Sequence, residues 1–159
     1  MQRAPTSAVV VTGLAAALTG LDGGSFGPAL PALRSGLRLD DARAAWLLSA
    51  YVLGTLLGNP GNAWICARRG ARFALSFGTA VYALGALAMA LSHDAPLACV
   101  ARFTQGVGAG SLLAIATATV AQRSPADRRG RAIMTLSLVY ALAFLGASIA
   151  ASWIGAAAW

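Results

Sequence analysis

The sequence contains little charge. Only 11% of its 159 residues are charged, lysine is absent, and the 12 basic residues are all arginines. Hydrophobic residues make up 58% of the chain, and its mean hydropathy is +0.69. Because about a quarter of the residues in a soluble domain are charged, this composition predicts a membrane protein.

Side chains that bind metals or act as nucleophiles are also scarce. The chain has one histidine, His93, and two cysteines, Cys66 and Cys99, which lie in separate apolar segments. Since no nucleophile–base set, metal-ligand cluster or phosphate loop is present, we expect no enzyme activity, no metal and no cofactor. We also expect no nucleic-acid partner despite the net charge of +7, because the arginines form short clusters between apolar runs.

Five apolar runs are each long enough to cross a bilayer as a helix. They cover residues 8–33, 44–66, 73–91, 97–121 and 132–156. A cleaved signal peptide is an alternative for the first run, but the apolar stretch continues well beyond a signal core of about 7 to 15 residues. The sequence therefore predicts an all-α membrane protein with five transmembrane helices.

The arginines predict the orientation of these helices. One side of the membrane would collect eight of them: Arg3, Arg68, Arg69, Arg72, Arg123, Arg128, Arg129 and Arg131. The other side would have three: Arg34, Arg38 and Arg43. The positive-inside rule then places the amino terminus in the cytoplasm and the chain in the cell membrane.

Two lone charges lie inside the apolar runs, Asp22 in the first and Arg102 in the fourth. A charge near the bilayer centre costs about 2.5 to 3.5 kcal/mol on insertion scales, so each needs a partner or a wet cavity. At about 1.5 Å per helical residue, both fall roughly 21 Å from the inner face. The matching depth predicts a functional pair, while a fixed ion pair that only holds two helices together is the alternative. Gln105 lies three positions after Arg102 and shares its face of the helix.

Glycines four residues apart are a further pattern of these runs. The pairs are Gly20 and Gly24, Gly54 and Gly58, and Gly106 and Gly110. Such pairs let a neighbouring helix backbone come close, so they predict tight helix packing.

Several short motifs resemble those of a known family. They are Leu21-Asp22 with Ala29-Leu30-Pro31, then Trp46 and Tyr51, then Arg102, Gln105, Gly106 and Gly108, then Arg129-Gly130-Arg131-Ala132, and finally Gly146 and Trp159. With these motifs the sequence resembles the major facilitator superfamily, and most closely the fourteen-helix branch of its drug:proton antiporters. The resemblance implies a fold of two related bundles with the site between them, of which this chain would form most of one six-helix bundle.

The resemblance also implies roles for individual residues. Asp22 and Arg102 would couple transport to protons, and Gln105 and Tyr51 would face the cavity and its substrate. Further roles are a gating loop formed by Arg68, Gly70 and Arg72, and helix packing by Gly106, Gly110 and Gly146. The gating loop departs from the family pattern, because Ala67 stands where the family has an aspartate.

Two functions remain open on this basis. The first is the amino-terminal part of a proton-coupled exporter of drugs or other small molecules, with membrane lipid, substrate, protons and the remainder of the transporter as partners. The second is a truncated or degenerate membrane protein that does not transport and serves as a structural partner, which the substitution at Ala67 and the end of the chain at Trp159 favour.

Overall fold

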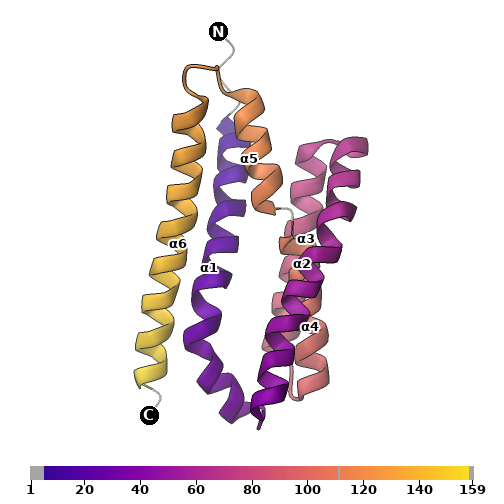
Figure 1. The fold of residues 1–159 in the computed structure, drawn as a ribbon, viewed down its shortest axis with the longest axis vertical. Coiled ribbons are helices and arrows are strands. Elements are labelled where there is room, and N and C mark those ends of the chain that lie inside the picture. The colour runs from indigo at the N-terminus through magenta and orange to yellow at the C-terminus, as the bar shows by residue number, and fades with distance from the viewer. Residues whose placement is uncertain (1–5, 111, 158–159) are drawn as a thin grey trace. The chain divides into compact units, whose positions relative to one another are not determined.

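The computed structural model describes residues 6–110 and 112–157, with side chains over 10–110 and 112–154. Six helices follow one another in this part of the chain, and it contains no strand (Figure 1). They are α1 (Thr6–Gly36), α2 (Asp41–Arg69), α3 (Ala71–Ala90), α4 (Ala95–Ala109), α5 (Leu112–Arg123) and α6 (Arg129–Ala157). The predicted all-α fold is therefore confirmed, whereas Arg3 and Trp159 lie outside the described residues.

The helices coincide with the five predicted apolar runs. The fourth run contains both α4 and α5, and residue 111 between them lies outside the described residues. Three stretches are long and apolar enough to cross a membrane: Ala71–Ala90, Ala95–Arg123 and Arg129–Ile154.

Short connections between the helices are fixed by polar caps and one glycine. Asp40 and Asp94 cap α2 and α4, where their Oδ1 atoms accept hydrogen bonds from the backbone N–H groups of Arg43 at 2.7 Å and Leu97 at 2.8 Å. Gly70 alone separates α2 from α3 and has φ 83°, a left-handed value that favours glycine. These caps and Gly70 define short turns between the helices.

The chain folds into two compact units, and each is described by itself. One comprises Met1–Pro28 and Leu112–Trp159, and the other comprises Ala29–Ser111. The second unit contains α2, α3 and α4, and α4 packs against both of the other helices (Figure 1).

Glycines bring α4 close to both of its neighbours. A Cβ at Gly54 or Gly58 of α2 would collide with the backbone of Phe103 or Val107 on α4. On the other side, a Cβ at Gly108 would collide with the backbone of α3 at Tyr82. Backbone therefore meets backbone at these positions, which is the geometry that small residues allow between helices.

The first unit uses glycine in the same way between α1 and α6. A Cβ at Gly20 or Gly24 would collide with the backbone of Tyr140 or Phe144. The Ser148 hydroxyl then donates a hydrogen bond to the carbonyl oxygen of Gly24 at 2.9 Å. Gly146 differs, because a Cβ there would meet nothing within 4 Å among the described residues, so its packing role finds no support in this unit.

Candidate functional site

Arg102 is a buried cation on α4, with only 4% of its surface exposed. Its guanidinium carbon lies 4.4 Å from the centroid of the Tyr51 ring on α2, and its Nη1 donates a hydrogen bond to Oε1 of Gln105 at 3.0 Å. Gln105 is also buried, with 5% exposed. Three of the residues predicted for the site therefore form one cluster, the Tyr51–Arg102–Gln105 cluster.

Close helix contacts place this cluster. Gly106 follows Gln105, and a Cβ there would collide with the carbonyl oxygen of Tyr51, so the backbones of α2 and α4 touch beside the site. Gly85 of α3 likewise lies against the backbone and Cγ of Gln105. The cluster thus sits where both α2 and α3 come into close contact with the α4 backbone, and its side chains have little room to move.

The cluster suits a permanent cation in an apolar surrounding. The face of an aromatic ring attracts a guanidinium by roughly 0.5 to 2 kcal/mol, depending on how dry the site is. The Gln105 amide oxygen adds a hydrogen bond to a charged donor, which is stronger than one between neutral groups. Tyr51 and Gln105 therefore replace part of the hydration that Arg102 gives up.

Asp22, the other predicted proton-coupling residue, is also buried, with 8% exposed. It lies on α1 in the first unit, where the Ser25 hydroxyl donates a hydrogen bond to its backbone carbonyl at 3.3 Å. Arg102 belongs to the second unit. The pairing of Asp22 with Arg102 thus stays a prediction.

The predicted gating loop lies between α2 and α3. The Arg68 guanidinium carbon is 4.5 Å from the centroid of the Trp64 ring, and that of Arg69 is 5.0 Å from the centroid of the Phe73 ring. Gly70 donates its N–H to the carbonyl oxygen of Cys66 at 2.9 Å and so ends α2. The remaining predicted loop residue, Arg72, is exposed. Aromatic faces thus hold two arginines of this loop.

One buried polar residue of the second unit was missed by the sequence analysis. Asn62 is 3% exposed, and its Nδ2 donates a hydrogen bond to the carbonyl oxygen of Val107 at 3.0 Å. It extends the row of Gly54 and Gly58 by one turn, so its position in an apolar run, four residues after a glycine pair, was the available signal. No group of three His, Cys, Asp or Glu side chains that could hold a metal occurs among the described residues.

Comparison with known proteins agrees with these features. The family model described as Major Facilitator Superfamily matches residues 12–159. The inner membrane transport protein YdhP of Escherichia coli K12 is 27% identical over 126 residues, which are 79% of this chain and 32% of the relative. The 3-(3-hydroxy-phenyl)propionate transporter of the same strain is 32% identical over 139 residues, or 87% of this chain and 34% of the relative.

A proton symporter is among the relatives as well. The arabinose-proton symporter of Escherichia coli K12 is 26% identical over 133 residues, covering 84% of this chain and 28% of the relative. The chain thus spans about a third of the length of these relatives. Because the family match covers nearly the whole chain and the described helices agree with it, this all-α membrane protein belongs to the major facilitator superfamily.

Proposed function

We propose that the chain is the amino-terminal part of a proton-coupled secondary transporter that exports drugs or other small molecules. Asp22 would be the proton-binding carboxylate and Arg102 its charge partner, while Gln105 and Tyr51 would line the cavity. The observation that carries this proposal is the buried Arg102, held by the Tyr51 ring and the Gln105 amide within an apolar helix. Charged groups at such positions are rare in membrane helices and mark ion or substrate pathways.

Proton coupling and the direction of transport have different support. The names of two relatives, the arabinose-proton and galactose-proton symporters, support proton coupling. Export by antiport is supported instead by the resemblance of Arg102, Gln105, Gly106 and Gly108 to the fourth-helix motif of the drug:proton antiporters. We therefore base the proposed direction of transport, export, on that motif.

In the proposed mechanism, the charge state of Asp22 follows the position of Arg102. A neighbouring cation favours an ionised carboxylate, and withdrawal of the cation from a low-dielectric site favours proton uptake. Asp22 and Arg102 would both lie in the first bundle, so rocking of the second bundle against it, as alternating access requires, would change the groups that face them and thereby move the Arg102 side chain relative to Asp22. Since the site lies between two bundles, we propose that the remainder of the transporter is a necessary partner.

Proton binding can be tested on the chain itself in lipid. Infrared difference spectra between acidic and alkaline buffer should show a protonated-carboxyl band that disappears in Asp22→Asn. Asp127→Asn, a change to an exposed loop carboxylate, is the matched control and should leave that band in place. Persistence of the band in Asp22→Asn would refute the assignment of the proton site.

Transport requires the complete polypeptide that carries this chain. In inverted vesicles with an imposed proton gradient, Asp22→Asn should abolish gradient-driven accumulation of a cationic dye while membrane insertion stays normal. Unchanged accumulation would contradict proton coupling through Asp22. Dye accumulation in vesicles that contain residues 1–159 alone would contradict the proposal that the remainder of the transporter is needed.

A structural role without transport is the second candidate, and Ala67 favours it. The resemblance places an aspartate at this position, where it would face the loop arginines, yet here Arg68 and Arg69 lie over aromatic rings. If this candidate is right, the complete polypeptide with Ala67 should not accumulate the dye in inverted vesicles. Accumulation by this wild-type polypeptide would favour the first candidate.

A further inference from the structure

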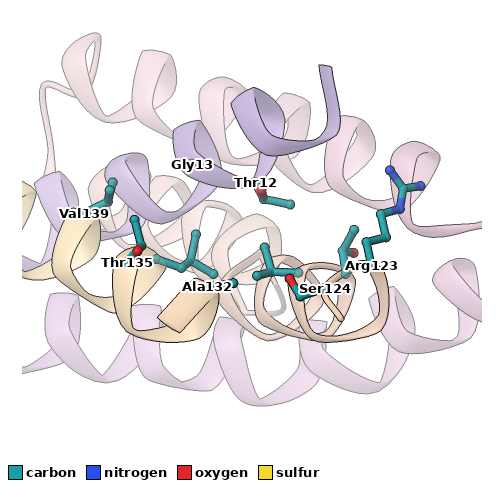
Figure 2. Close-up of a pocket in the computed structure, with 10 residues that line it drawn as sticks. Thr12, Gly13, Arg123, Ser124, Ala132, Thr135 and Val139 are labelled. Carbon is teal, nitrogen blue, oxygen red and sulfur yellow. The ribbon is translucent and has the colours of Figure 1, made fainter. Parts of the chain in front are cut away.

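A cavity of about 260 Å³ lies within the first unit, between α1, α5 and α6 (Figure 2). Thr12 and Gly13 of α1, Val120 of α5 and Ala132, Leu136 and Val139 of α6 form most of its wall. No role assigned above to Asp22 or to the Tyr51–Arg102–Gln105 cluster involves this cavity.

The wall offers apolar contact and few hydrogen bonds. Two of its hydroxyl groups are directed to their own helices, since Thr119 donates to the carbonyl oxygen of Ile115 at 2.7 Å and Thr135 to that of Arg131 at 2.9 Å. A polar solute would lose hydration here without an equivalent set of donors. The wall therefore fits a hydrocarbon chain better than a polar substrate.

The rim of the cavity is cationic. Arg123, the last residue of α5, belongs to the lining, and its side chain extends beyond one end of the cavity past Ser124 (Figure 2). Arg128, Arg129 and Arg131 follow in the connection to α6 and its first turn, and the one acidic residue there, Asp127, forms an ion pair with Arg128 at 3.5 Å. An apolar cavity thus opens beside a cluster of arginines at the end of two helices.

We propose that this cavity holds one acyl chain of an anionic phospholipid, with the headgroup phosphate bound by Arg123. The charge of the rim and the apolar wall select this occupant, because basic pockets between membrane helices at the interface bind anionic lipid headgroups. The α5–α6 end of the first unit then becomes a lipid-binding site, and this assignment does not depend on transport.

Native mass spectrometry of the 159-residue chain in detergent provides the test. The chain is offered equal amounts of phosphatidylglycerol and phosphatidylcholine with matched acyl chains, and the ratio of the two bound lipids is measured. Because the ratio is internal to each spectrum, partial loss of folded protein does not affect it. Wild type should prefer phosphatidylglycerol, and glycerol phosphate without acyl chains should not compete.

Two pairs of variants locate the site. Val139→Phe narrows the cavity, whereas Leu138→Phe adds the same ring at a neighbouring α6 side chain that is 56% exposed. Arg123→Gln removes the rim cation, whereas Arg72→Gln removes an exposed arginine of the second unit that does not line the cavity. Arg123→Gln should lower the lipid ratio about fivefold, as expected for one interfacial arginine. Val139→Phe should instead lower the fraction of the chain that carries either lipid, because the acyl chains are matched, and the two controls should leave both quantities nearly unchanged.

Three results would overturn the proposal. Equal losses in Arg123→Gln and Arg72→Gln would indicate diffuse charge attraction. Competition by glycerol phosphate would indicate a site for a free anion. An unchanged fraction of lipid-bound chain in both Val139→Phe and Ala132→Leu, a second change that narrows the cavity, would exclude an acyl chain from it.

Discussion

At the scale of single residues, the central feature is how an apolar helix tolerates Arg102. The guanidinium lies on the Tyr51 ring and donates to the Gln105 amide, so its neighbours on α2 and α4 take over the role of water. Tyr51 and Gln105 thus stabilise the guanidinium without carrying a charge themselves.

The Tyr51 ring is expected to stabilise the second unit through this contact. Tyr51→Phe keeps the ring face, whereas Tyr51→Leu removes it, so Tyr51→Leu should lower the free energy of unfolding by about 1 to 2 kcal/mol more than Tyr51→Phe. Unfolding in mixed micelles measures the difference. Trp46→Leu, at an α2 ring that is 67% exposed, is the control and should cost less than Tyr51→Leu. Equal effects of both changes at position 51 would contradict the ring-face contact.

The Arg102 side chain should tolerate lysine only in part. An ammonium can lie over the Tyr51 ring, but it lacks the planar fork that reaches Gln105 at the same time. Arg102→Lys should therefore fold with reduced stability, and Arg102→Ala should lose about 3 kcal/mol or more if it leaves a buried carboxylate without its cation. The yield of monodisperse protein and its unfolding midpoint rank the stabilities of wild type, Arg102→Lys and Arg102→Ala. Wild-type stability in Arg102→Ala would show that no buried anion depends on this arginine.

Sequence reasoning reached this cluster only partly. The contact of Arg102 with Gln105 follows from a spacing of three residues on one helix, so it was predictable. The position of Tyr51 above the guanidinium depends on the rotation of α2 against α4, which the Gly54, Gly58 and Gly106 contacts determine in three dimensions. Asn62 was missed because a single amide in an apolar run gives no sign of its acceptor on another helix.

At the scale of the elements, the α2–α4 interface combines backbone contacts with the Tyr51–Arg102 contact and the hydrogen bond of the Asn62 amide. Gly54, Gly58 and Asn62 follow each other at intervals of four residues on α2 and face α4 between Phe103 and Val107. The glycine pairs predicted close packing, but nothing in a single sequence states which helix approaches which.

The glycine contact predicts opposite effects for two similar substitutions on α2. A methyl group at Gly58 would collide with the Val107 backbone, so Gly58→Ala should destabilise the protein by about 1 to 3 kcal/mol. At Gly61, three residues later, a Cβ would meet nothing within 4 Å, so Gly61→Ala should be neutral or stabilise by about 0.5 to 1 kcal/mol through helix propensity. Unfolding in mixed micelles compares the stabilities of Gly58→Ala and Gly61→Ala. Equal destabilisation by the two changes would contradict the close contact of Gly58 with α4.

Loss of the Asn62 amide should also destabilise the α2–α4 interface. Asn62→Leu removes the donor to the buried carbonyl of Val107, which should cost about 1 to 3 kcal/mol. Asn59→Leu changes an exposed amide on the same helix and should cost much less. If the two variants unfold at the same denaturant concentration, the hydrogen bond to Val107 does not contribute to stability.

At the scale of the whole molecule, composition and family agree, and orientation is the property still to be measured. Low charge and five apolar runs predicted an all-α membrane protein, and the helices and the family match confirm it. Hydropathy carries no information about which helices pack against each other within each unit. Orientation, in contrast, follows from the arginines of the loops alone.

Accessibility of the two short turns should establish this orientation. On a background without Cys66 and Cys99, single cysteines are introduced at Ala67, near the α2–α3 turn, and at His93, in the α3–α4 turn. Gly70 is unsuitable for cysteine because its φ of 83° would strain any side chain. Because the arginines place the α2–α3 turn in the cytoplasm, an impermeant maleimide added to intact cells should label His93→Cys and not Ala67→Cys, and permeabilisation should expose both. The reverse labelling pattern would show that the protein has the opposite orientation. The basic α5–α6 connection and its proposed lipid site would then lie at the outer face.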